Sequence, residues 1–126
     1  MIKPAHVQIR AVGAYVPPRR VTNEELAESV ETSDEWIRSH TGIGARHLAE
    51  DDVATSDLAV GAVRDMLRRH GLHTEHIGAI ICATATQDYP GFPATACVIQ
   101  DKLGLRTIPA FDISAGCTGF IYALEL

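Results

Sequence analysis

The sequence predicts an α/β fold in which helices cover both faces of a mixed sheet. Short apolar runs of strand length alternate along the chain with segments in which apolar residues recur at helical spacing. Two of the runs, residues 77–83 and 108–113, are largely apolar at consecutive positions, which is typical of strands buried on both faces. With 126 residues, of which 46% are hydrophobic and 21% charged, the chain can form one domain core, so residues 1–126 are treated as one unit.

The first half of the chain predicts a strand and two short helices. Residues 7–12 alternate between apolar and polar side chains, as a half-buried strand does. Thr22 and Glu25 have the spacing of a capping box, which opens a helix that runs to about residue 30. Ser33 is expected to cap a second short helix that carries Trp36.

The second half predicts two longer helices between the buried strands. Thr55 or Ser56 caps a helix that Gly71 ends. After a loop at residues 87–92, Pro93 suits the first turn of the next helix, and Gly104 follows its last turn.

Cys117 is the candidate nucleophile. It lies between the run 108–113 and a helix-like pattern, and Gly116 and Gly119 flank it as the glycines of G-x-S-x-G flank a serine. Backbone N–H groups at such a junction favour a thiolate and could stabilise an oxyanion. The alternative is that Cys117 is a small core hydrophobe, as most free cysteines are, and local spacing leaves both interpretations open.

Composition limits the classes of partner and compartment. A net charge of −5 and a pI near 5.6 argue against nucleic acid as a partner. We expect no membrane role, because the longest apolar stretch is too short to span a bilayer and the N-terminus lacks a signal sequence. Three cysteines without C-x-x-C spacing predict neither disulfides nor a metal site, and indicate a reducing cytoplasm.

The segment around Cys117 resembles the active-site motif of the ketoacyl synthase III group, within the thiolase-like superfamily. These are the β-ketoacyl-acyl-carrier-protein synthases that begin fatty-acid synthesis. The resemblance covers nearly the whole chain and implies a thiolase-like half-domain, incomplete and truncated after the active-site cysteine, whose downstream half is absent. The segments that match the family in order are residues 13–17, 22–26, 32–37, 41–43, 92–97 and 109–112.

The resemblance implies an acyltransferase of lipid metabolism, a cytoplasmic homodimer without a cofactor. Cys117 would take a short acyl group from acyl-CoA and condense it with malonyl-acyl-carrier protein, with loss of CO2. The family's catalytic histidine and asparagine lie downstream of the cysteine, so residues 1–126 alone are expected to be inactive. One alternative is a related acyltransferase or condensing enzyme of secondary metabolism or of the hydroxymethylglutaryl-CoA synthase type. The other is a non-catalytic module in which Cys117 is buried and inert.

The same resemblance assigns roles to residues outside the cysteine motif. Trp36 would hold the adenine of coenzyme A, with Thr32 and Arg38 beside it, although a place in the core is an alternative for Trp36. His40 stands where the family commonly has a phosphate-binding arginine. Phe92 would close the acyl pocket of the partner in a dimer, unless it is a hydrophobic staple, and Thr86 would line the same pocket.

Overall fold

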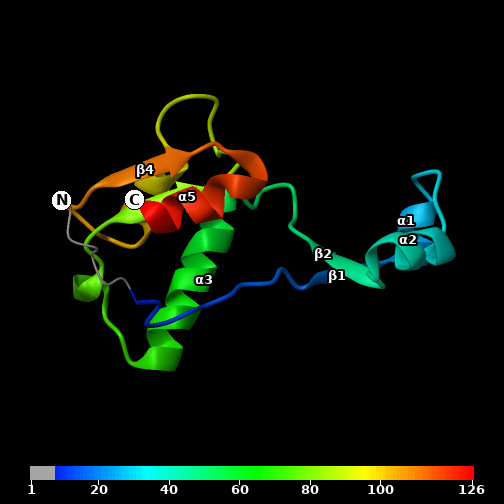
Figure 1. The fold of residues 1–126 in the computed structure, drawn as a ribbon, viewed down its shortest axis with the longest axis horizontal. Coiled ribbons are helices and arrows are strands. Elements are labelled where there is room, and N and C mark those ends of the chain that lie inside the picture. The colour runs from blue at the N-terminus through cyan, green and yellow to red at the C-terminus, as the bar shows by residue number, and fades with distance from the viewer. Residues whose placement is uncertain (1–7) are drawn as a thin grey trace, which may run out of the picture. The chain divides into compact units, whose positions relative to one another are not determined.

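The computed structural model describes residues 8–126, which form two compact units (Figure 1). The smaller unit is Val16–Ala54, and the larger combines residues 8–15 with Thr55–Leu126. Helices and strands alternate along both units, so the mixed helix-and-strand fold predicted from the sequence is confirmed.

The smaller unit contains an antiparallel strand pair and two short helices. β1 (Arg19–Thr22) pairs with β2 (Ala45–Leu48), with Arg19 opposite Leu48 and Thr22 opposite Ala45. Between them in sequence lie α1 (Asn23–Ala27) and α2 (Asp34–Thr41). The two strands therefore flank α1 and α2 in sequence, and α2 carries Trp36.

Both predicted caps of these helices are present. The Thr22 hydroxyl accepts a hydrogen bond from the Glu25 N–H at 3.2 Å, and the Ser33 hydroxyl accepts one from the Trp36 N–H at 3.1 Å. Each bond satisfies an N–H group that the helix itself leaves unpaired. α1 ends at Ala27, earlier than predicted, and Gly42 ends α2 with a φ of 72°, a conformation that favours glycine.

A buried asparagine joins the elements of the smaller unit. The Asn23 side chain is fully buried, and its amide nitrogen donates to Asp34 Oδ1 at 2.7 Å and to the Ile43 carbonyl at 2.8 Å. Its oxygen accepts from Arg46 at 2.6 Å. The Asn23 bond, followed by the bond from Arg38, holds the pKa of Asp34 below its usual value.

We expect Asn23→Ala to lower the free energy of unfolding by about 2 kcal/mol, because buried partners would lose their hydrogen bonds. The pKa of Asp34 should rise towards its ordinary value of 3.8. A carboxylate with a lowered pKa stabilises the fold above its unfolded pKa, and this contribution disappears as the pH falls through the folded value. Denaturant unfolding at pH 7 and pH 3 measures both effects, with the exposed Glu24→Gln as control. A loss no larger than that of the control contradicts the prediction.

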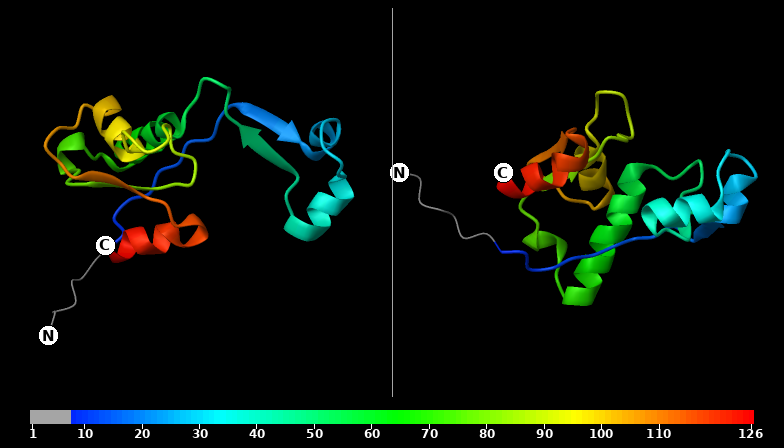
Figure 2. Two further views of the ribbon diagram at one scale, coloured as in Figure 1. Left: turned by 90° about the horizontal axis from the view of Figure 1, so that it is seen from above. Right: turned by 45° about the vertical axis from the view of Figure 1, so that its right-hand side comes forward.

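The larger unit places helices on both faces of a parallel strand pair. β3 (Ile80–Ala83) pairs with β4 (Ala110–Ile113), with Ile80 opposite Ala110. α4 (Thr95–Lys102) contacts both strands and packs against α3 (Thr55–His70), while α5 (Gly119–Glu125) contacts the strands from the other side (Figure 2). The predicted covering of both sheet faces is confirmed for this pair.

The predicted strand at residues 7–12 is wrong for residues 8–12, and Val7 lies outside the described residues. This segment runs along α3 instead. A Cβ at Gly13 would overlap the Ala62 carbonyl, and the Ala14 N–H donates to Asp65 at 3.2 Å. The strands of the described residues form two separate pairs rather than one mixed sheet. Alternation predicts a strand with one buried face, but Ile9 and Val12 are 67% and 69% exposed, so this segment has no such buried face among the described residues.

Glycines predict the ends of the helices better than the apolar runs predict the ends of the strands. Gly71 and Gly104 have φ values of 61° and 68°, and they end α3 and α4 as predicted. β3 begins at Ile80, later than the predicted residue 77, and the Ile77 N–H bonds back to the 3-10 turn η1 (Thr74–His76) at the Thr74 carbonyl rather than to a strand. Pro93 precedes α4 rather than forming part of its first turn.

Candidate active site

Cys117 lies where the sequence places it, between a strand and a helix. It is the central residue of the 3-10 turn η2 (Gly116–Thr118), which joins β4 to α5. Gly116 has a φ of 52°, which only glycine adopts without strain. A Cβ at Gly119 would lie 3.3 Å from the Ala83 Cβ, so this glycine permits close packing of α5 on β3.

The turn exposes the thiol of Cys117 to solvent. The N–H and the hydroxyl of Thr118 both donate to the Ala115 carbonyl, at 3.2 and 2.8 Å, and these bonds close the turn. Cys117 itself is exposed, and none of residues 8–126 forms a hydrogen bond with its thiol. The interpretation of Cys117 as a small core hydrophobe is therefore wrong.

The two other cysteines have different surroundings. Cys82 on β3 is partly buried, and burial together with the negative charges of Asp112 and Asp88 raises the pKa of its thiol to about 11. Cys97 on α4 is also partly buried, and its thiol donates to the Ala110 carbonyl at 3.5 Å. Cys117 is thus the one exposed cysteine of the described chain.

Iodoacetamide at pH 7.5 should modify Cys117 well before Cys82 or Cys97, because alkylation requires an accessible thiolate. The raised pKa keeps the Cys82 thiol protonated at that pH. Its rate should therefore increase roughly tenfold for each pH unit until the pH approaches 11. Peptide mapping by mass spectrometry over time measures the three rates. Equal rates for Cys82 and Cys117 at pH 7.5 would refute this assignment.

The candidate pocket residues Thr86 and Phe92 lie in the loop between β3 and α4, which projects from the strand pair (Figure 1). The Thr86 carbonyl accepts a hydrogen bond from the Thr55 hydroxyl at 2.6 Å, and its own hydroxyl lies 3.1 Å from the same atom. Phe92 is 92% exposed. Its interpretation as a hydrophobic staple for α4 is wrong, because a staple would bury the ring.

The candidate coenzyme residues gather at the start of α2, in the smaller unit. Trp36 is 57% exposed, so its alternative place in the core is wrong. One face of its indole stacks on the His40 imidazole, with ring centroids 4.3 Å apart and an interplanar angle of 22°. Trp36 and Thr32 line a shallow pocket of about 280 Å³ together with Glu31 and Ser33.

Arg38 is already paired in this structure. Its Nε donates to both carboxylate oxygens of Asp34 at 2.8 Å. Its two terminal nitrogens lie beside Gly44, and within residues 8–126 they have no hydrogen-bond partner. The terminal nitrogens are therefore the part of Arg38 that could contact a phosphate.

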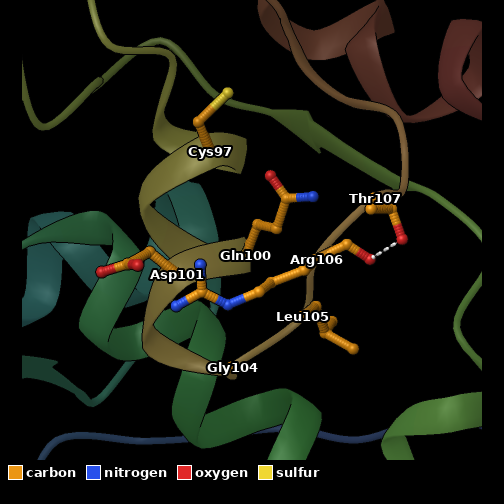
Figure 3. A pocket seen from close by; sticks show the side chains of 7 residues that line it. All are labelled: Cys97, Gln100, Asp101, Gly104, Leu105, Arg106 and Thr107. Atoms are coloured by element: carbon orange, nitrogen blue, oxygen red, sulfur yellow. Dashed lines mark hydrogen bonds between the residues drawn. The ribbon is translucent and has the colours of Figure 1, made fainter.

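A second hollow lies beside α4 and the residues that follow it, and neither Thr86 nor Phe92 lines it (Figure 3). It has a volume of about 390 Å³ and an open, partly polar lining. Gln100, which borders it, donates to the Ile108 carbonyl at 2.8 Å, and the Thr107 hydroxyl donates to its neighbour's carbonyl at 2.6 Å. These two polar side chains thus bond to the local backbone. The lining residues are Cys97, Gln100, Asp101, Gly104, Leu105, Arg106 and Thr107.

Sequence reasoning missed the polar residues that organise the loop carrying Thr86 and Phe92. Asp112, in the otherwise apolar β4, accepts hydrogen bonds from the first N–H groups of α4. Asp88 accepts one from the Ser56 N–H at 3.0 Å, so neither Thr55 nor Ser56 is the side-chain cap of α3 that the sequence predicts. A lone carboxylate in an apolar strand was the available signal.

Residues 8–126 lack two features, a metal-binding cluster and a membrane-spanning helix. No three histidine, cysteine, aspartate or glutamate residues of this range are grouped so that they could hold a metal ion. No helix in the same range is both long and apolar enough to cross a lipid bilayer.

The chain is similar to known condensing enzymes. It is 48% identical over 124 residues to the β-ketoacyl-[acyl-carrier-protein] synthase III of Sulfurovum sp. (strain NBC37-1), covering 98% of this chain and 36% of the relative. The crystal structure of β-ketoacyl-[acyl-carrier-protein] synthase III from Thermus thermophilus matches with a TM-score of 0.86 at 49% identity, covering 94% of this chain and 36% of that one. The priming β-ketosynthase of the R1128 polyketide pathway matches with a TM-score of 0.82 at 33% identity, covering 91% and 34%. No protein-family model matches.

Proposed function

From the premise that this chain is a homologue of β-ketoacyl-[acyl-carrier-protein] synthase III, of which it spans about 36%, we propose that it carries the acyl-accepting cysteine of a condensing enzyme. The predicted thiolase-like fold is confirmed as part of such a domain. The observation that carries the proposal is the exposed Cys117 at the turn between β4 and α5. A cysteine retained only for packing would be buried.

The first half-reaction transfers a short acyl group from acyl-CoA to Cys117. The thiolate attacks the thioester carbonyl carbon, a new carbon–sulfur bond forms, and the bond to the coenzyme sulfur breaks. Coenzyme A leaves as a thiolate and takes up a proton from solvent. The Thr118 and Gly119 N–H groups already donate within the turn, so another N–H of the turn, such as that of Cys117, is suited to stabilise the oxyanion, since a fixed donor needs no reorganisation during the reaction.

The coenzyme binds through the residues of α2 and the segment before it. The exposed face of Trp36 stacks on the adenine, and Thr32 borders the same pocket. The terminal nitrogens of Arg38 contact a phosphate, a role favoured by their lack of partners among the described residues. Acyl-CoA is a substrate in this scheme, and no further cofactor takes part.

The second half-reaction condenses the acyl group with malonyl-acyl-carrier protein. Loss of CO2 from the malonyl group leaves a carbanion equivalent, which attacks the acyl-cysteine carbonyl, and the Cys117 thiolate is released. The active protein is a cytoplasmic homodimer in which Phe92 closes the acyl pocket of the partner. Phe92 is 92% exposed, so within the described residues its ring is accessible for this role.

The direct test is the reaction of the complete protein with acetyl-CoA and malonyl-acyl-carrier protein. We expect a β-ketoacyl-acyl-carrier protein, free coenzyme A and CO2 in equal amounts, measured by mass spectrometry and gas analysis. Acylation of Cys117 without a condensation product would instead favour an acyltransferase that uses the same cysteine. No acylation of Cys117 by any acyl-CoA would refute the proposal.

The second candidate is the priming condensation of polyketide synthesis. It is favoured by the structural match to the R1128 priming β-ketosynthase at 33% identity, although the identity to a β-ketoacyl-[acyl-carrier-protein] synthase III is higher, at 48%. Both candidates use the first half-reaction at Cys117. Competition between the acyl-carrier protein of fatty-acid synthesis and that of a polyketide pathway, as malonyl thioesters, distinguishes them by the ratio of kcat/KM.

A further inference from the structure

A carboxylate on the strand that leads to Cys117 holds the start of the neighbouring helix. Asp112 lies in β4, and its two oxygens accept hydrogen bonds from the Thr95 and Ala96 N–H groups, each at 2.7 Å. Hydrogen bonds from helix N–H groups to a carboxylate are charge-assisted, and the negative charge also interacts favourably with the positive end of the helix dipole. The first turn of α4 is therefore fixed to β4 by side-chain contacts as well as by packing.

Thr95 connects this attachment to the loop that precedes α4. Its side chain is fully buried, and its hydroxyl accepts a hydrogen bond from the Asp88 N–H at 3.1 Å. The Asp88 carboxylate in turn accepts a bond from the Ser56 N–H at the start of α3. A series of polar contacts thus runs from β4 through Thr95 to the middle of the loop and then to α3.

The end of this series of contacts at α3 is also held by hydrogen bonds. Ser56 is fully buried, and its hydroxyl accepts a hydrogen bond from the Lys102 ammonium at 2.7 Å. The neighbouring Thr55 holds the Thr86 carbonyl, near the start of the loop. By contrast, Tyr89 and Phe92 are 50% and 92% exposed, so packing of their rings contributes little to the loop conformation. Polar contacts at Thr86, Asp88 and Thr95 therefore determine where the loop lies.

We propose that the Thr95 hydroxyl is a positioning group that sets acyl-chain selectivity, by holding the loop of Thr86 and Phe92 relative to the strand that leads to Cys117. The proposal rests on the function proposed above, in which these two loop residues bound the acyl pocket. Thr95 acts only through the loop and does not contact the substrate. Loss of its hydroxyl removes the acceptor of the Asp88 N–H, and the loop that forms the wall of the acyl pocket is then held less firmly.

The test compares Thr95→Val with Thr95→Ser in the complete protein, because valine keeps the shape but removes the acceptor, whereas serine keeps it. We measure kcat/KM for acetyl-CoA and hexanoyl-CoA. For Thr95→Val we expect the acetyl-to-hexanoyl ratio to fall at least fivefold, while Thr95→Ser keeps the wild-type ratio. Asp88→Ala, which removes the loop's bond to α3, should shift the ratio in the same direction if Thr95→Val does not fold. The exposed Asp101→Ala on α4 is the control and should leave the ratio unchanged.

A second readout is independent of activity. Hydrogen exchange measured by mass spectrometry should be faster in the segment around Asp88 for Thr95→Val than for Thr95→Ser. The alkylation rate of Cys117 should be equal in the two variants. A purely structural role would lower kcat/KM for both substrates by the same factor, and an unchanged ratio in Thr95→Val and Asp88→Ala overturns the proposal. If the wild-type protein accepts no acyl group on Cys117, the proposed function itself has failed, and the selectivity proposal fails with it.

Discussion

Replacement of Cys117 by serine should abolish the acyl adduct and reduce condensation by at least about a thousandfold. A serine hydroxyl requires a general base to become nucleophilic at neutral pH, and no described residue forms a hydrogen bond with the side chain at this position. The complete protein is incubated with acetyl-CoA, and its intact mass is measured. The wild type should gain the mass of one acetyl group, and Cys117→Ser should gain none.

The matched control is Cys97→Ser, which removes a thiol that is partly buried and bonded to the Ala110 carbonyl. This variant should keep the adduct, and peptide mapping should locate it on Cys117. An adduct of equal yield on Cys117→Ser would mean that another group accepts the acyl chain, and the assignment of the nucleophile would be wrong.

Trp36→Ala should raise the KM for acyl-CoA by about 5- to 150-fold, which corresponds to the loss of about 1 to 3 kcal/mol of stacking on the adenine. Trp36 is more than half exposed, so this change leaves no cavity in the core, and the stability of the protein should change little. The KM for malonyl-acyl-carrier protein should stay near its wild-type value, because that substrate carries no adenine. Steady-state kinetics with each substrate varied in turn measures the difference.

Trp36→Phe separates the loss of stacking from a general disturbance of α2. Phenylalanine offers a smaller aromatic face, so the KM for acyl-CoA should lie between those of the wild type and the alanine variant. His40→Ala provides a further comparison, because it removes the imidazole that stacks on the indole at 4.3 Å. An unchanged KM for acyl-CoA in Trp36→Ala would exclude a coenzyme role for this residue.

Local features of the fold could be predicted from the sequence because they depend on neighbouring residues. Thr22 and Ser33 cap their helices with bonds to N–H groups three residues away, and Gly71 and Gly104 end theirs with positive φ values. The strand predicted at residues 8–12 was wrong, because their apolar and polar residues alternate but Ile9 and Val12 are exposed and no described strand pairs with them. The pairing of β3 with β4 joins residues about thirty positions apart, and the sequence alone determines no such register.

In the candidate site, too, features that depend on neighbouring residues were predicted and features that depend on side-chain conformation or distant contacts were not. Cys117 was predicted because strand, glycine, cysteine and helix are consecutive, so that short-range geometry displays the thiol. The exposed stacking of Trp36 on His40 was not predicted, although the two residues are one helical turn apart, because stacking depends on side-chain conformation. The contacts of Asp112 with Thr95 span 17 positions and depend on how α4 meets β4.

Residues 16–54 form the smaller unit, in which Arg19–Thr22 pairs antiparallel with Ala45–Leu48. This unit has a buried polar centre of its own in Asn23, and it contains the whole Trp36 pocket. Under the proposed function, recognition of the leaving group and display of the nucleophile are therefore encoded in separate stretches of sequence. In that case variation in residues 16–54 would change which thioester donor the protein accepts without altering the turn around Cys117, so donor preference and bond-forming chemistry would evolve independently.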